Sequence, residues 1–136
     1  MLSNRSVPSC TVIPVLTYPD PGVAADWLYK AFGFTVRLRI GNHRIQMKAG
    51  DGCFVVREGT AAAGTGHAVM VRVLDADAHC ERARQHGAQI TELPTTHMFG
   101  ERQYNAVDFA GHHWTFTQTI ADINPEDWGG TSVDLS

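Results

Sequence analysis

Hydrophobic and polar positions along the chain form two successive series of the same predicted elements. In the first series, β-branched residues at 11–18 predict a strand. Apolar residues spaced three and four apart from Ala24 to Phe32 then predict an amphipathic helix, which Gly33 ends. Short turns that contain glycine separate three further predicted strands, at 35–40, 43–48 and 52–58.

The second half of the chain repeats this order after a linker at 59–66 that is rich in glycine and alanine. Alternating apolar residues at 67–73 predict a strand, and Asp75 is the expected N-cap of a helix that Gly87 ends. The remaining strands are predicted at 89–93, 101–108 and 113–119, with a possible lid loop at 94–100 and a polar tail at 120–136 anchored by Trp128.

A repeat of this length indicates two copies of one βαβββ module, at about 11–58 and 67–119. Two half-open sheets can pair around a single cavity. The function is therefore expected inside that cavity.

The amino-acid composition excludes several classes of protein. Of 136 residues, 43% are hydrophobic and 18% charged, which predicts one ordered domain over 1–136. A net charge of −3 with scattered Lys and Arg argues against nucleic acid as a partner. The polar segment 1–10 lacks the apolar core of a secretory signal and no run is long enough to span a bilayer, so a cytoplasmic protein without a membrane partner is expected. Cys10, Cys53 and Cys80 lack CxxC spacing and indicate neither a disulfide framework nor a zinc ribbon.

Two segments carry a family resemblance, TVIPVLTYPDPGVAADWLYKAFGF at 11–34 and GERQYNAVDFAGHHWTFTQ at 100–118. They resemble the signature regions of the glyoxalase, bleomycin-resistance and extradiol-dioxygenase superfamily, also called vicinal oxygen chelate, and most closely its PhnB-like branch. The resemblance implies an α+β fold in which two βαβββ modules form a cupped mixed sheet with helices outside. It also implies a homodimer.

Enzymes of that family hold a divalent metal in the cup through His, Gln and Glu side chains. The spacing of the family's ligands leads to four positions in this chain, Ile13, Val56, Ala68 and Thr115. Ile, Val and Ala have no donor atom, and a neutral Thr hydroxyl is a poor ligand, so no metal or other cofactor is expected.

His67 and Gln118 each lie near one of these positions and are of ligand type, but they share parity with the apolar, helix-facing residues. A one-residue shift along a strand points a side chain to the opposite face, so both are expected at strand ends or on the surface. A metal site that uses His67 or Gln118 would require a β-bulge that shifts the strand register and turns the side chain into the cup.

The other histidines and one cysteine are weighed in the same way. His79 and His86 are expected on the solvated surface of the second helix, and His112 is expected to be exposed after a turn glycine. His113 has cup-facing parity, which favours binding or packing over acid–base catalysis because no partner for it is visible. Cys53 is expected to be a buried thiol without a base beside it.

Alternation along the strands, transferred from the second module to the first by their spacing in the sequence, predicts which side chains line the cup. The predicted wall is mainly apolar and carries a few polar groups. Such a wall suits a small organic ligand, and Arg44 or Arg72 either pairs with a carboxylate or phosphate on it or reaches past the rim into water. The predicted ligand-binding residues are Ile13, Val15, Arg44, Gln46, Phe54, Met70, Arg72, Gln103, Asn105, His113 and Thr115.

The leading hypothesis is a metal-independent protein that binds a small molecule in a cup at a homodimer interface. The first alternative is a metal-dependent lyase, isomerase or dioxygenase of the same superfamily with a shifted metal site. A third is an assembly or regulatory module whose cup is vestigial. The linker at 59–66 permits a cup built within one chain as well as one built by exchange between two chains.

Overall fold

The computed structural model describes residues 2–60 and 66–132. The predicted linker lies largely outside the described residues, as does the end of the predicted tail. The first module comprises β1 (Val15–Tyr18), α1 (Pro21–Phe32), β2 (Thr35–Ile40), β3 (Arg44–Ala49) and β4 (Gly52–Glu58). Its four strands form sheet A in the order β1-β4-β3-β2, with β1 parallel to β4 and the other pairs antiparallel.

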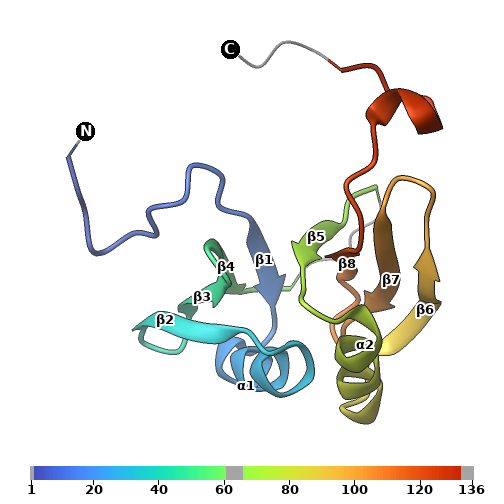
Figure 1. Cartoon of the computed structure of the whole chain (residues 1–136). Helices are drawn as coiled ribbons and strands as arrows, with labels where there is room; N and C mark the ends of the chain where they lie inside the picture. The colour runs from blue at the N-terminus through green and yellow to red at the C-terminus, as the bar shows by residue number, and fades with distance from the viewer. Residues whose placement is uncertain (1, 61–65, 133–136) are drawn as a thin grey trace.

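The second module repeats this topology with β5 (Val69–Arg72), α2 (Ala76–Gln85), β6 (Gln89–Thr96), β7 (Glu101–Val107) and β8 (His113–Thr119). Sheet B has the equivalent order β5-β8-β7-β6. Figure 1 shows both helices on the same side of the two sheets, while the N-terminal segment and the tail lie on the other side. The predicted α+β fold of two βαβββ modules is confirmed.

Local sequence explains where α1 begins and ends. The Asp20 side chain accepts the Val23 N–H at 3.2 Å, and Pro21 fits the first turn because proline has no N–H to satisfy there. Gly33 ends the helix with φ of 82°, a left-handed conformation that glycine adopts without steric cost.

The predicted lid loop is shorter than expected because β6 continues to Thr96. Thr95 and Thr96 pair with Gln103 and Arg102 of β7 after a register shift that accommodates Pro94. Beyond β8, a 3-10 helix (Pro125–Trp128) follows, and the Trp128 ring packs on Phe99 with ring centroids 5.2 Å apart. Trp128 is 41% exposed, and the start of the tail is also held by the N–H groups of Ile120 and Ala121, which donate to the Gly100 carbonyl.

Aromatic side chains from both modules meet in one core between the helices and the sheets. Phe54 of β4 contacts Trp114 of β8, with centroids 5.5 Å apart, and Phe32 at the end of α1 contacts Phe116, with centroids 4.8 Å apart. These side chains are buried. Because the rings interlock across the module boundary, the two repeats are stabilised by the same apolar contacts.

A buried carboxylate joins the modules a second time. Asp108 accepts the Tyr18 hydroxyl at 2.6 Å and the Trp114 indole N–H at 3.1 Å. Burial, the Asp108 charge and this hydrogen bond raise the pKa of Tyr18. Nearby, His112 is 8% exposed, with its Nε2 2.8 Å from the Thr17 carbonyl oxygen. The prediction that His112 is exposed is therefore wrong, because this contact to β1 is distant in sequence.

The helix-borne histidine His79 also differs from its prediction. It is half-buried, its Nε2 lies 2.9 Å from the Phe32 carbonyl oxygen of α1, and its Nδ1 contacts the Tyr104 hydroxyl. Arg82, one turn further along α2, donates to the carbonyls of Tyr29 and Lys30, each at 2.8 Å. The C-terminal end of α1 is thus held by side chains from α2, whereas His86 is exposed as expected.

Each sheet has one face toward the helices and one face, called here the open face, that points away from them. The described strands pair only within their own sheet, so sheets A and B do not close a continuous wall by strand pairing among residues 2–60 and 66–132. Within the same residues, no helix combines the length and apolar character needed to cross a membrane.

Candidate functional site

The open face of sheet B gathers the residues predicted to bind a ligand in the second module. Met70 of β5 pairs with Thr115 of β8, which pairs with Asn105 of β7, so these three side chains point to the same face. The same register places Arg72, Gln103 and His113 on that face. Trp114 and Phe116, at the intervening positions, lie in the core.

Polar side chains on this face are hydrogen-bonded to one another in two chains. In the first chain, the Thr115 hydroxyl donates to Asn105 Oδ1 at 2.8 Å, and Asn105 Nδ2 donates to Glu92 Oε2 at 2.9 Å. These bonds fix the orientation of the Asn105 amide. Because Glu92 and Asn105 pair across β6 and β7, the carboxylate lies on the same face.

In the second chain, Gln103 Nε2 donates to the Thr117 hydroxyl at 3.1 Å, and that hydroxyl donates to Glu101 at 2.7 Å. Arg72 approaches Glu101 at 3.7 Å. Although burial acts to raise it, the pKa of Glu101 is lowered overall, because hydrogen bonds from Thr117 and Thr119 and the Arg72 charge favour the carboxylate. The sequence analysis did not identify Glu92 or Glu101 as residues of this face. Glu101 lies two positions before Gln103 on the same strand, so strand alternation could have placed it there.

A hollow of about 300 Å³ lies at one end of the open face of sheet B. His67 and Ala68, just before β5, line it together with Asn105, His113 and Thr115. His67 precedes the first residue of β5, so strand alternation does not dictate its direction. The hollow therefore combines two imidazoles, an amide and a hydroxyl with apolar surface.

In sheet A the predicted residues divide between the two faces. Val15 pairs with Val55, which pairs with Gln46, and Arg44 lies two positions from Gln46, so Val15, Arg44 and Gln46 share the open face. Phe54 instead pairs with Met47 in the core and is 3% exposed. The expectation that Phe54 lines the open face is wrong. Ile13 is half-buried and precedes β1, which begins two residues later than Ile13.

The cause of the Phe54 error is the length of the turn. Ala49 pairs directly with Gly52 across a two-residue turn (50–51), whereas Val107 pairs with His113 across a longer loop (108–112). Positions counted from the turn glycine in one module therefore fall on the opposite face in the other.

The residues at the family's ligand positions do not fit a metal. Val56 is fully buried and faces the core, and the Thr115 hydroxyl is already bonded to Asn105. Gln118 points toward α2, where its amide oxygen accepts the Ala76 N–H at 2.8 Å. Among residues 2–60 and 66–132, no three His, Cys, Asp or Glu side chains are grouped as metal ligands.

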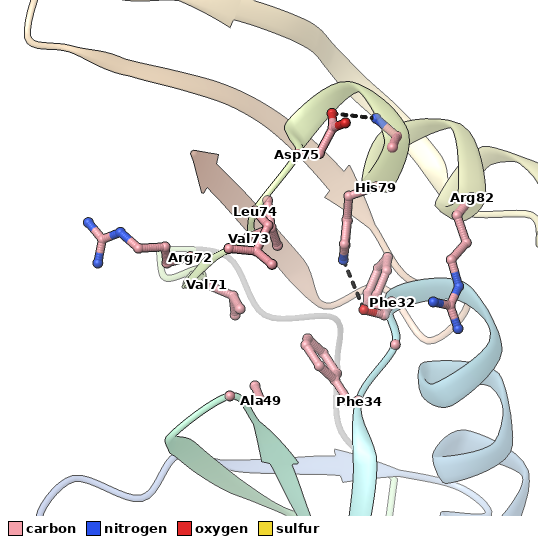
Figure 2. Close-up of a pocket in the computed structure, with 13 residues that line it drawn as sticks. Phe32, Phe34, Ala49, Val71, Arg72, Val73, Leu74, Asp75, His79 and Arg82 are labelled. Atoms are coloured by element: carbon pink, nitrogen blue, oxygen red, sulfur yellow. Dashed lines mark hydrogen bonds between the residues drawn. The ribbon is translucent and has the colours of Figure 1, made fainter. Parts of the chain in front are cut away.

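A second hollow, of about 400 Å³, lies between the modules near the N-terminal end of α2. Figure 2 shows the Phe34 ring and Val71 beside it, with His79 pointing to the Phe32 carbonyl. Its polar groups already have structural partners, since Asp75 caps α2 and His79 is bonded through both ring nitrogens. This junction pocket is therefore a weaker candidate for ligand recognition than the open face of sheet B.

Comparisons with solved structures agree with this fold. TioX from Micromonospora sp. ML1 is 33% identical, with a TM-score of 0.69 over 85% of this chain and 100% of that chain. The fosfomycin resistance protein FosX from Listeria monocytogenes is 14% identical, with a TM-score of 0.68 over 81% of this chain and 93% of that chain, and shows likeness of fold alone.

Among curated proteins, an uncharacterised protein from Mycobacterium bovis is 29% identical over 68 residues, which is 50% of this chain and 45% of that protein. The chain thus matches less than half the length of this relative. The family model described as Glyoxalase/Bleomycin resistance protein/Dioxygenase superfamily matches residues 11–116. The repeated βαβββ modules, the site and this match lead to one conclusion: the chain belongs to the glyoxalase/bleomycin resistance/dioxygenase superfamily.

Proposed function

We propose that this protein binds a small organic molecule on the open face of sheet B without a metal or other cofactor. The observation that carries the proposal is the hollow of about 300 Å³ where the Asn105 amide, held by Thr115 and Glu92, meets two histidines. Polar groups that are already oriented lose little side-chain entropy when they bind a ligand. Such preorganisation favours recognition of a defined molecule.

The chemistry of the face suggests the kind of ligand. Met70 is 61% exposed on the edge strand β5, and it offers a polarisable apolar surface to a ring or chain. The Arg72 side chain is largely exposed beside it and can pair with a carboxylate or phosphate. A ligand with an apolar body and an anionic or hydrogen-bonding group matches this arrangement.

The proposal includes a homodimer and a place in the PhnB-like branch of the superfamily. Within the described residues the two open faces belong to separate sheets, and each offers partly exposed apolar side chains such as Val15 and Met70. A second copy that covers the open face of sheet B would bury Met70 and complete a cup around the ligand. The proposed location is the cytoplasm.

The proposal is tested by a thermal-shift screen of small aromatic and aliphatic acids in buffer with a chelator. Compounds that bind are expected to raise the melting temperature with the chelator present. The shift is expected to shrink in Asn105→Ala and Met70→Ala. The matched control Gln85→Ala, on the exposed surface of α2, is expected to retain it.

Metal analysis of protein purified without chelators completes the test. We expect far less than one metal ion per chain. One tightly held divalent ion per chain, whose removal abolishes binding, would overturn the proposal in favour of a metal-dependent lyase, isomerase or dioxygenase.

A further inference from the structure

We propose that Cys10 and Cys53 form an intrachain disulfide under oxidising conditions and that this bond fastens residues 2–14, called here the N-terminal arm, over the open face of sheet A. This proposal is independent of ligand binding at sheet B. Three observations support it: the contacts of the N-terminal arm with sheet A, the positions of the two thiols, and the access of an oxidant to them.

The N-terminal arm is held on the open face of sheet A by specific contacts. Gln46 of β3 donates to the Ser6 carbonyl at 2.8 Å, and Arg37 of β2 donates to the Arg5 carbonyl at 3.0 Å. Arg37 also donates to the Gln46 amide oxygen. Figure 1 shows this segment on the side of sheet A opposite α1.

Burial confirms that the arm covers part of this face. Gln46 is 4% exposed although it points away from the helices, and Val55 on the same face is also buried. Pro8 of the arm is buried in turn. On the corresponding strand of sheet B, Asn105 is only partly buried, so the two open faces are covered to different degrees.

The two cysteines meet where the arm crosses the turn between β3 and β4. Cys53 pairs with Lys48, at a position that points to the open face. The Cys10 thiol lies 3.6 Å from the backbone carbonyl oxygen of Asp51, two residues before Cys53, and it is close enough to the Cys53 thiol to raise the pKa of that group. Both residues are partly exposed, whereas Cys80 is buried on α2 beneath sheet B.

An oxidant can reach this pair. Cys53 lines a hollow of about 530 Å³ together with Val12, Pro14 and Met70. Burial raises the pKa of the Cys53 thiol, and the neighbouring Cys10 thiol raises it further, so Cys53 is a weak first nucleophile. Cys10 is itself partly exposed on the N-terminal arm, and we assign the first attack to it.

The oxidant required is a low-molecular-weight disulfide, for which oxidised glutathione is the probe. The Cys10 thiolate attacks one sulfur of the probe, and the glutathione thiolate leaves. The Cys53 thiolate then attacks the Cys10 sulfur of the mixed disulfide, and the second glutathione thiolate leaves. Two protein thiols are oxidised, one disulfide is reduced to two thiols, and both protons pass to solvent or to the released glutathione.

The test uses the full chain incubated with oxidised glutathione at about pH 8, where a larger fraction of thiols is ionised. Free thiols are then alkylated after denaturation and the protein is mapped by mass spectrometry without reduction. We expect a linked peptide pair containing Cys10 and Cys53, the mass of a single chain, and Cys80 as the alkylated thiol.

Variants sharpen the test. Cys80→Ala is expected to form the same bond, whereas Cys10→Ser and Cys53→Ser are each expected to leave no internal disulfide. Hydrogen exchange at residues 6–10 is expected to slow after oxidation and to recover with a reductant in the wild type, but not to change in Cys10→Ser.

Three outcomes would overturn the proposal. They are separate glutathione adducts on Cys10 and Cys53 without a link, a disulfide that includes Cys80, and a Cys10–Cys53 bond between two chains. A link that forms without slower exchange in the arm would refute its role as a fastening.

Discussion

At the scale of single residues, two of the side chains that join the modules are histidines that the sequence pattern placed on the surface. His79, on α2, and His112, in the turn just before β8, both contact backbone carbonyls of the first module. Their partners, Phe32 and Thr17, are far away along the chain. Periodicity reports which face a residue occupies, but it carries no information about such distant carbonyl partners.

The environment of His79 leads to a pH prediction. Burial lowers the pKa of His79, the Arg82 charge lowers it further, and the bond to the Phe32 carbonyl opposes this only in part. The pKa is thus lower in the folded state than the ordinary 6.5 of the unfolded chain. The unfolded state binds more protons as pH falls through that value. His79 therefore contributes stability that is present above about pH 6.5 and lost below it.

Denaturant unfolding measured between about pH 8 and 5 checks this prediction, since the window spans the ordinary histidine pKa. The free energy of unfolding is expected to fall less steeply toward acid in His79→Gln than in the wild type. His86→Gln, at an exposed position of the same helix region, is expected to leave the wild-type slope unchanged. Equal slopes in His79→Gln and the wild type would contradict the account.

At the scale of elements, α1 is ended by its own sequence and by a neighbouring helix. Gly33 supplies the left-handed C-terminal residue, while Arg82 of α2 donates to two carbonyls of the last turn of α1. Helix C-terminal carbonyls lack partners within their own helix and carry partial negative charge. The Arg82 guanidinium donates hydrogen bonds to these carbonyls, offsets their negative charge and joins the two helices.

Replacing Arg82 by Met removes two charge-assisted hydrogen bonds but keeps much of the aliphatic length. We expect a loss of about 1–2 kcal/mol in the free energy of unfolding. The matched control is Arg84→Met, because Arg84 pairs with Glu81 on the exposed surface of the same helix. Its expected loss is much smaller, because an exposed ion pair contributes little to stability. Chemical denaturation of both variants provides the measurement, and similar losses would contradict the role given to Arg82.

Most elements follow from sequence because their signals are local. The N-cap of α1 and the glycine after it predicted where this helix begins and ends. The apolar alternation in β5 predicted a strand and the face to which each side chain points, and Met70, Asn105 and Thr115 do lie on one face. Phe54 was not, because β4 is apolar at several consecutive positions and its face was inferred from the other module. A difference in turn length between the repeats reversed that inference.

At the scale of the whole molecule, two equivalent modules have acquired unequal open faces. Sheet A is partly covered by the N-terminal arm, which buries Gln46, whereas sheet B leaves Met70 exposed beside an ordered set of polar groups. Sequence could predict the repeat, but not this difference, because it depends on where residues 2–14 lie. The asymmetry makes the open face of sheet B the expected place of ligand recognition.

The most direct test of that expectation is an amide chemical-shift map. The strongest compound from the screen is added to isotope-labelled protein in buffer with a chelator. We predict that the largest shifts fall at Met70, Asn105 and Thr115 and their neighbours on the open face of sheet B. The account is contradicted if the largest shifts fall at Phe34 and Val73 in the junction pocket, or if they disappear when the chelator is present.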